Sequence, residues 1–327
     1  MSPDFGGRVD DYILAHPYMS GEAIAREIGK DAANVRRRIR QLRDIYPDMD
    51  WYVDPRHKVD VSHEPKRYRR IRPRQGKDVG TMLEVVCGDF HVPFHDETAI
   101  ACLLGYLVDH QPDGFTINGD FLDCYAVSSF SKDPVRETQL QDEIDEANAV
   151  LDAIDAVLPS TCAKRFVIGN HEARLERYLR DNARALHGLR VLGIASLLRL
   201  DERGYEVVPM VGRDASVFVG KVEVGHFNKV SKHSAYTAKN IVDERGCSII
   251  QSHTHRLGAY YKRMRGTGEH IGGWEIGCLC DLDPEYVSNP NWSHGFATIT
   301  RCEGSSRFHV ALHEIIGGEL LVAGKRY

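Results

Sequence analysis

The sequence has 327 residues, of which 42% are hydrophobic and 27% charged, and its net charge is −5. These values are typical of a soluble globular protein with one large core and room for a small second domain. No apolar run reaches the roughly 18 residues of a membrane span, and the first residues lack the pattern of a secretory signal peptide. We therefore expect a cytoplasmic protein without a membrane partner, and the sequence leaves its oligomeric state open.

Cysteine spacing argues against a zinc ribbon or a disulfide framework. Eight cysteines occur without a CxxC pair, and the closest two are Cys278 and Cys280. We interpret all eight as reduced core thiols.

Charge is distributed unevenly along the chain. Residues 1–78 contain 17 basic and 13 acidic residues, whereas the remainder contains 25 basic and 34 acidic ones. Residues 66–77 hold seven of the basic residues and no acid. Such a run is typical of a solvated linker, and it also attracts a phosphate backbone. We expect a small domain at 1–65, a basic linker at 66–80 and a larger domain at 81–327.

The small domain has the pattern of three short helices, at residues 9–17, 20–29 and 31–46, followed by a hairpin at 51–62. This order resembles a winged helix-turn-helix. The resemblance implies DNA binding, with the third helix in the major groove and arginines on its outer face in contact with phosphates or bases. The candidates for these contacts are Arg36, Arg37 and Arg40. Helix-turn-helix patterns also serve as protein-protein modules, so both kinds of partner stay open.

The larger domain alternates strand and helix patterns, which predicts an α/β fold. Apolar segments run into polar tips at residues 81–92, 114–123 and 163–172, and helical patterns cover 96–111 and 138–158. Further strand patterns occur at 215–227, 247–261 and 294–302. We expect two sheets packed face to face and flanked by helices, with ligands gathered at the carboxyl ends of the strands.

Five polar tips follow these apolar segments, and together they suggest a metal centre. Their members are Asp89, His91, Asp120, Asn170, His226, His253 and His255. Carboxylate and amide oxygens mixed with imidazoles suit Mn, Fe, Ni or Zn and do not suit calcium. Strand alternation would explain the spacing in "DFH" and "HTH", because residues two apart share a face.

The blocks "GDFH", "NGDFLD", "GNHE", "GH" and "HTH" resemble the calcineurin-like metallophosphoesterases over residues 81–312. The resemblance implies a four-layer α/β/β/α double-sheet core that binds two divalent metal ions, with Mn as the first expectation. Matching motifs assign Asp89, His91 and His255 to one ion. They assign Asn170, His226 and His253 to the other ion, with Asp120 as the bridge.

Two cations of this kind clamp phosphate oxygens and activate a bound hydroxide that attacks phosphorus. The family pattern gives His171 the role of general acid for the leaving group. Asp123 is a candidate for orienting His171 or a metal ligand. Glu172 either orients His171 or simply begins the next helix.

Lys229, Lys232 and His233 are candidates for phosphate contact or form an ordinary solvated helix start. Arg174 and Arg177, one helical turn apart after "GNHE", are also placed to point towards phosphate. We expect a two-metal phosphoesterase acting on nucleic acid or nucleotides, as a nuclease, phosphodiesterase or end phosphatase. The alternatives are a phosphoprotein or small-molecule phosphatase and a non-catalytic DNA-binding regulator. Cys124 stands where phosphoprotein phosphatases have Arg, which weakens the first alternative.

Overall fold

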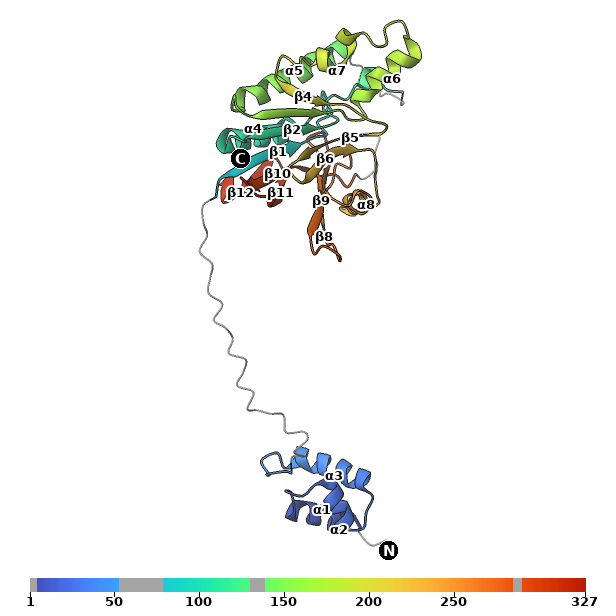
Figure 1. Cartoon of the computed structure of the whole chain (residues 1–327), viewed down its shortest axis with the longest axis vertical. Helices are drawn as coiled ribbons and strands as arrows, with labels where there is room; N and C mark the ends of the chain where they lie inside the picture. The colour runs from blue at the N-terminus through green and yellow to red at the C-terminus, as the bar shows by residue number, and fades with distance from the viewer. Residues whose placement is uncertain (1–4, 53–78, 130–138, 285–289) are drawn as a thin grey trace. The chain divides into compact units, whose positions relative to one another are not determined.

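The computed structural model of the chain describes residues 5–52, 79–129, 139–284 and 290–327 (Figure 1). The chain divides into two compact units, residues 1–76 and 77–327. Within these described ranges, no helix combines the length and the apolar character that crossing a membrane requires.

The first unit contains three helices, α1 (Phe5–Ala15), α2 (Gly21–Glu27) and α3 (Ala32–Ile45), close to the predicted positions. The side chain of Ser20 accepts a hydrogen bond at the start of α2, and that of Asp31 does so at the start of α3. The hairpin predicted at 51–62 lies outside the described residues except for Trp51 and Tyr52, as does the whole basic run. A winged helix is therefore not shown, and the observed unit is a small three-helix body.

Helix α3 buries Val35, Ile39 and Leu42, as its sequence pattern predicts. Its outer arginines differ in their surroundings. Arg36 forms an ion pair with Glu22 of α2, so its charge is already partnered. Arg37 and Arg40 are exposed and make no ion pair within the described part of the chain.

The second unit is built on two mixed sheets. The larger has the strand order β13-β12-β11-β10-β1-β2-β3-β4. Its strands are β1 (Thr81–Cys87), β2 (Gly114–Asn118), β3 (Ala163–Val167), β4 (Tyr205–Val208), β10 (His294–Cys302), β11 (Phe308–Ile316), β12 (Glu319–Val322) and β13 (Lys325–Arg326). Strands β1 to β4 are parallel, and β10 runs antiparallel to β1.

The smaller sheet has the order β5-β6-β7-β9-β8. Its strands are β5 (Asp214–Val219), β6 (Val222–Phe227), β7 (Ser248–Gln251), β8 (Leu257–Arg263) and β9 (His270–Ile276). Strands β6, β7 and β9 are parallel. The carboxyl ends of neighbouring parallel strands therefore lie along one edge of each sheet.

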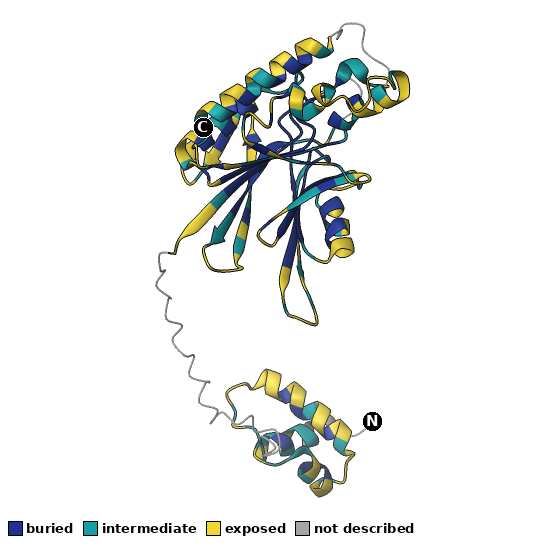
Figure 2. Cartoon of the chain, turned by 45° about the horizontal axis from the view of Figure 1, so that its top comes forward, coloured by how far each residue is buried: buried dark blue, intermediate teal, exposed yellow. Residues whose placement is uncertain are grey.

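The two sheets pack face to face, and helices cover their outer faces. Val86 and Ile299 of the larger sheet share one buried cluster with Val224 and Trp274 of the smaller one. Helices α4 (Glu97–His110) and α5 (Leu140–Val157) pack on the larger sheet, and α8 (Tyr236–Arg245) packs on the smaller. Figure 2 shows the buried residues concentrated in the strands between these helices. The expected α/β double-sheet architecture is present.

The predicted helices agree with α4 and α5 to within two residues. The predicted strands are too long at their carboxyl ends, because β1 ends at Cys87, β2 at Asn118 and β3 at Val167. The polar tips follow in loops. Helices α6 (Glu172–Asn182) and α7 (Ile194–Leu197) lie between β3 and β4, with the short 3-10 helix η4 (Arg190–Leu192) before α7. Another 3-10 helix, η2 (Tyr125–Val127), follows β2.

Candidate metal centre

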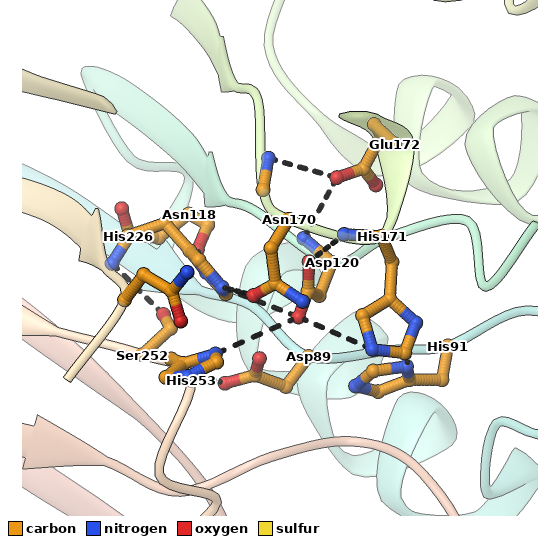
Figure 3. A network of polar contacts seen from close by, with 12 residues as sticks. Asp89, His91, Asn118, Asp120, Asn170, His171, Glu172, His226, Ser252 and His253 are labelled. Atoms are coloured by element: carbon orange, nitrogen blue, oxygen red, sulfur yellow. Dashed lines mark hydrogen bonds and ion pairs between the residues drawn. The ribbon is translucent and has the colours of Figure 1, made fainter. Parts of the chain in front are cut away.

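The predicted metal ligands lie together at the carboxyl ends of strands from both sheets, and Figure 3 labels all of them except His255. Loops after β1, β2, β3 and β7 carry most of them, and β6 carries one near its end. By element they are Asp89 and His91 after β1, Asp120 after β2, Asn170 after β3, His226 in β6, and His253 and His255 after β7. Residues far apart in sequence thus meet at one place between the sheets.

Left-handed backbone, rather than strand pleating, aims many of these side chains. Five of the seven have positive φ: Asp89 (53°), His91 (51°), Asp120 (50°), His253 (74°) and His255 (56°). The strand alternation expected for "DFH" and "HTH" is therefore wrong, since the chain has already left the strand. Left-handed backbone costs roughly 1–2 kcal/mol for a residue other than glycine. Such conformations persist where the surrounding structure fixes them, and they cluster at functional sites.

Asp120 is the centre of one group of ligand atoms. Its Oδ2 lies 3.2 Å from Nε2 of His226 and 4.0 Å from Nδ1 of His253. Oδ1 of Asn170 lies 3.1 Å from the same Nε2 of His226. The carboxylate, two imidazoles and an amide oxygen therefore converge on one small volume.

His91, His255 and Asp89 form a second group beside the first. Nε2 of His91 lies 3.1 Å from Nε2 of His255, which in turn lies 3.5 Å from Oδ1 of Asp89. Nδ1 of His91 lies 3.0 Å from Oδ2 of Asp123, and in the neutral ring donation from this nitrogen would leave Nε2 with a lone pair facing His255. Oδ1 of Asp89 is buried and has no hydrogen-bond partner. A cation would satisfy these unmatched lone pairs, so the donor set fits a metal.

A hydrogen bond from the other ring nitrogen orients His226. Its Nδ1 donates to the carbonyl of Asn118 at 2.9 Å, which leaves Nε2 facing Asp120. Burial favours a low pKa for His226, but the charge of Asp120 raises it to about 10. Burial favours a high pKa for Asp120, but His226 and His171 hold it well below its usual range. The central carboxylate is therefore charged.

Glu172 has a different role from the one expected beside His171. Its buried carboxylate accepts hydrogen bonds from four backbone N–H groups. The donors are Asp120 (3.1 Å), Phe121 (2.7 Å), Leu122 (2.9 Å) and Gly169 (2.8 Å). The carboxylate thus joins the loop after β2 to the loop after β3, and the expectation that it orients the imidazole is wrong.

Gly169 is required by this close approach. A Cβ at this position would lie 2.2 Å from Oδ1 and 2.3 Å from the backbone nitrogen of Asp120. The glycine therefore lets the ends of β2 and β3 come together, which is a steric reason beyond the formation of a turn.

His171, Asp123 and Arg174 form a connected group at the start of α6. Nδ1 of His171 donates to Oδ2 of Asp123 at 3.1 Å, and Nη2 of Arg174 donates to Nε2 of His171 at 2.8 Å. Nη1 of Arg174 also donates to Oδ1 of Asp123 at 3.0 Å. Burial lowers the pKa of His171 to about 4, which fits a neutral imidazole that accepts from the guanidinium.

Three predicted phosphate contacts lie apart from this cluster. Lys229, Lys232 and His233 are exposed in the segment between β6 and α8. Lys229 forms an ion pair with Glu244, and His233 packs against the ring of Tyr236. Among the described contacts, none joins these three residues to a predicted ligand.

Two contributors were not predicted from the sequence. The carbonyl of Asn118 orients His226, and Sγ of Cys280 lies 3.8 Å from Nδ1 of His255. Cys280 also groups with His91 and His255 as a possible ligand set. Its position shortly after β9 repeats the pattern of a polar tip behind an apolar strand, and that signal could have identified it.

The pattern of the family described as calcineurin-like phosphoesterase matches residues 84–263, which include both histidine groups and Asp120. The chain belongs to the calcineurin-like phosphoesterase family. The Gene 54 protein of Mycobacterium phage L5 is 29% identical over 254 residues, covering 74% of this chain and 96% of that protein. The Gene 54 protein of Mycobacterium phage D29 is 30% identical over 254 residues, covering 73% and 96%.

Solved structures are similar at a lower level. Vacuolar Protein Sorting 29 from Cryptosporidium parvum has a TM-score of 0.38 and 12% identity, over 76% of this chain and 96% of that one. Purple acid phosphatase PPD1 from yellow lupin seeds has a TM-score of 0.39 and 12% identity, over 75% and 53%. The family assignment rests on the sequence match alone.

We predict that Glu172→Gln weakens the fold around the metal centre. The amide would place its own donors against backbone N–H groups that then lack an acceptor. We expect the free energy of unfolding to fall by about 2–4 kcal/mol, measured by denaturant titration with a chelator present. Metal affinity should fall as well, because Asp120 loses its support.

Glu143→Gln is the matched control for this substitution. The carboxylate of Glu143 is also buried, but it accepts from the N–H groups of Tyr125 and Ala126, beyond Asp120. We expect it to lower stability while leaving metal affinity close to that of the unmodified protein. Wild-type stability and metal affinity in Glu172→Gln would contradict the proposed support of Asp120.

Proposed function

We propose that this member of the calcineurin-like phosphoesterase family is a two-metal hydrolase of phosphate esters in nucleic acids or nucleotides. The observation that supports it best is the position of Asp120, a charged carboxylate between two groups of histidines. One ion would be held by Asp89, His91 and His255, the other by Asn170, His226 and His253, and Asp120 would join them. Two divalent ions, with Mn as the first expectation, would supply a nucleophile and charge neutralisation for phosphoryl transfer.

In this proposal the negative charge of a bound phosphate favours protonation of Nε2 of His171 by solvent, and Nε2 then passes that proton to the leaving oxygen. Asp123 holds Nδ1, so the ring keeps one orientation while Nε2 gains and loses a proton. Arg174 now donates to Nε2, and an arriving phosphate would compete for that guanidinium. A guanidinium that turns to the phosphate would release Nε2 for the leaving group. Arg174 thereby serves as the phosphate contact suggested by its position after "GNHE".

The first unit supports nucleic acid as the substrate class. Arg37 and Arg40 on α3 are exposed and unpaired within the described residues, as phosphate contacts require. Arg36 is less suited to this role, because it is already paired with Glu22. We propose that the exposed face of α3 binds DNA and recruits substrate to the hydrolase.

Asp120→Asn tests the metal centre directly. We expect loss of bound Mn and a fall in the rate of hydrolysis on the order of 100-fold or more. Substituting a residue that only hydrogen-bonds to a metal ligand already lowers metal affinity or activity by about 10–100-fold. Metal content would be measured by elemental analysis, and activity with a chromogenic diester and with end-phosphorylated and nicked DNA. Asp201→Asn, at an exposed carboxylate, is the control and should retain both properties.

The same assays separate the alternatives. Full activity and full metal content in Asp120→Asn would remove the proposed centre. Metal-dependent turnover restricted to phosphopeptides would favour a phosphoprotein phosphatase. Absence of turnover by the wild-type protein with every divalent metal would favour a non-catalytic regulator.

His171→Ala should keep its metals and lose rate mainly with poor leaving groups. General acid catalysis is commonly worth about 10²–10⁴-fold, and p-nitrophenolate needs little protonation. We therefore expect a large loss with alkyl phosphate esters and a small loss with p-nitrophenyl esters. An equal loss with both classes would contradict the assigned proton transfer.

The double variant Arg37→Ala/Arg40→Ala should weaken binding to duplex DNA. The slope of log K against log salt concentration should shrink by about 2, close to one for each phosphate contact. Arg263→Ala/Arg265→Ala removes the same charge from the exposed β8–β9 hairpin and is the control. Unchanged affinity in the first variant would indicate that α3 contacts a protein partner.

A further inference from the structure

An arginine-rich segment follows the metal centre in the chain, and only its first arginine, Arg174, has a role in the function proposed above. Residues 174–190 contain five arginines and two acidic residues, although residues 79–327 as a whole are acidic. Residues 184–191 are all exposed, and α6 and the segment after it carry much exposed surface in Figure 2. This basic segment begins three residues after His171.

A pocket of about 620 Å³ lies between α6 and the segment that leads into α7. Its apolar lining includes Ile168, Leu179, Leu192, Ile194 and Met210. This volume falls within the range of small-molecule sites, which combine an apolar lining with a few polar groups. The pocket can therefore accept an apolar body about the size of a nucleobase.

Basic groups surround this apolar lining. Arg177, Arg180, His187 and Arg190 line the pocket. Arg180 pairs with Asp181, whereas Arg177 and Arg190 make no ion pair with any residue that the structure describes. Of the two acidic residues in the lining, Glu176 lies 3.7 Å from His187 and Glu172 is buried against backbone N–H groups. Two arginines are thus left to bind an anion.

The pocket and the metal centre share the turn after β3. Ile168 and Glu172 line the pocket, while Asn170 and His171 lie with the predicted ligands. Leu189 lines the pocket and is 47% exposed, so part of its side chain is accessible to a ligand there. A nucleic acid strand carries a phosphate on every nucleotide, so one strand would place phosphates at both sites.

We propose that this pocket binds a nucleotide of single-stranded nucleic acid next to the scissile phosphate. Arg177 and Arg190 bind flanking phosphates, and the apolar lining with Leu189 receives a base. The assignment rests on the proposed function for its substrate class. A peptide of Asp and Glu alone would satisfy the arginines, but it offers no flat apolar group for the lining, so the nucleotide is favoured.

The test measures binding without turnover. A fluorescein-labelled trinucleotide of thymidine is titrated with the full chain in the presence of a chelator, and fluorescence anisotropy reports affinity. A single-stranded trinucleotide is too short to form the duplex that α3 is proposed to bind. We expect Arg177→Ala/Arg190→Ala to bind on the order of tenfold more weakly. The control Arg263→Ala/Arg265→Ala should bind like the wild-type protein.

A second variant tests the apolar lining. Leu189→Ser changes an exposed side chain, so the fold should be retained. It should weaken binding of the thymidine trinucleotide and leave binding of an abasic trinucleotide unchanged. Equal losses with both probes would overturn the base-binding role of the pocket.

Other outcomes separate this inference from the proposed function. Equal losses in the two double variants, no loss in either, or equal displacement of the probe by a hexaglutamate peptide would overturn the inference. Weak trinucleotide binding by Arg177→Ala/Arg190→Ala, together with a wild-type protein that hydrolyses no phosphate ester with any divalent metal, would remove the proposed function. The pocket would then stand as a nucleotide-binding site without a scissile phosphate beside it.

Discussion

The candidate metal centre depends on the hydrogen bonds that the carboxylate of Glu172 accepts. They come from four backbone N–H groups in two loops, which follow the neighbouring strands β2 and β3. Loops at strand ends have few hydrogen-bond partners of their own, and a buried N–H without an acceptor costs about 1–3 kcal/mol. A single acid on α6 supplies these acceptors and fixes Asp120. The positions of the two histidine groups relative to the central carboxylate follow from this anchor.

Burying that charge is unfavourable by itself. Burial and the nearby charge of Asp120 raise the pKa of Glu172 to about 7, although the backbone N–H groups oppose this shift. Two buried carboxylates so close together destabilise the fold unless positive charge lies between or beside them. The histidine groups, and any cations that they hold, provide that charge. Metal binding and folding are therefore expected to be coupled in this unit.

Much of the architecture could be predicted from the sequence, because hydrophobic periodicity reports burial directly. The helices α4 and α5 and the existence of two sheets follow from it. The strand ends could not be predicted, because apolar residues such as Phe90 and Phe121 continue the pattern into loops that are also buried. That continuation suggested strand alternation for "DFH", where the backbone is in fact left-handed.

The site shows the same division between chemistry and geometry. Residue types predicted the candidate ligands, which the structure brings together, since Asp, Asn and His offer the donor atoms that such metals bind. Residue types could not identify the groups that hold the ligands in place. In the sequence, a glutamate that accepts from backbone N–H groups cannot be distinguished from one that contacts an imidazole. Glu172 was therefore interpreted either as a partner of His171 or as the start of the next helix, and only its place at the start of α6 is confirmed. Arg174, which contacts that imidazole, was taken only as a phosphate contact. Supporting roles depend on side-chain direction at the end of a strand, and direction is set by the tertiary fold.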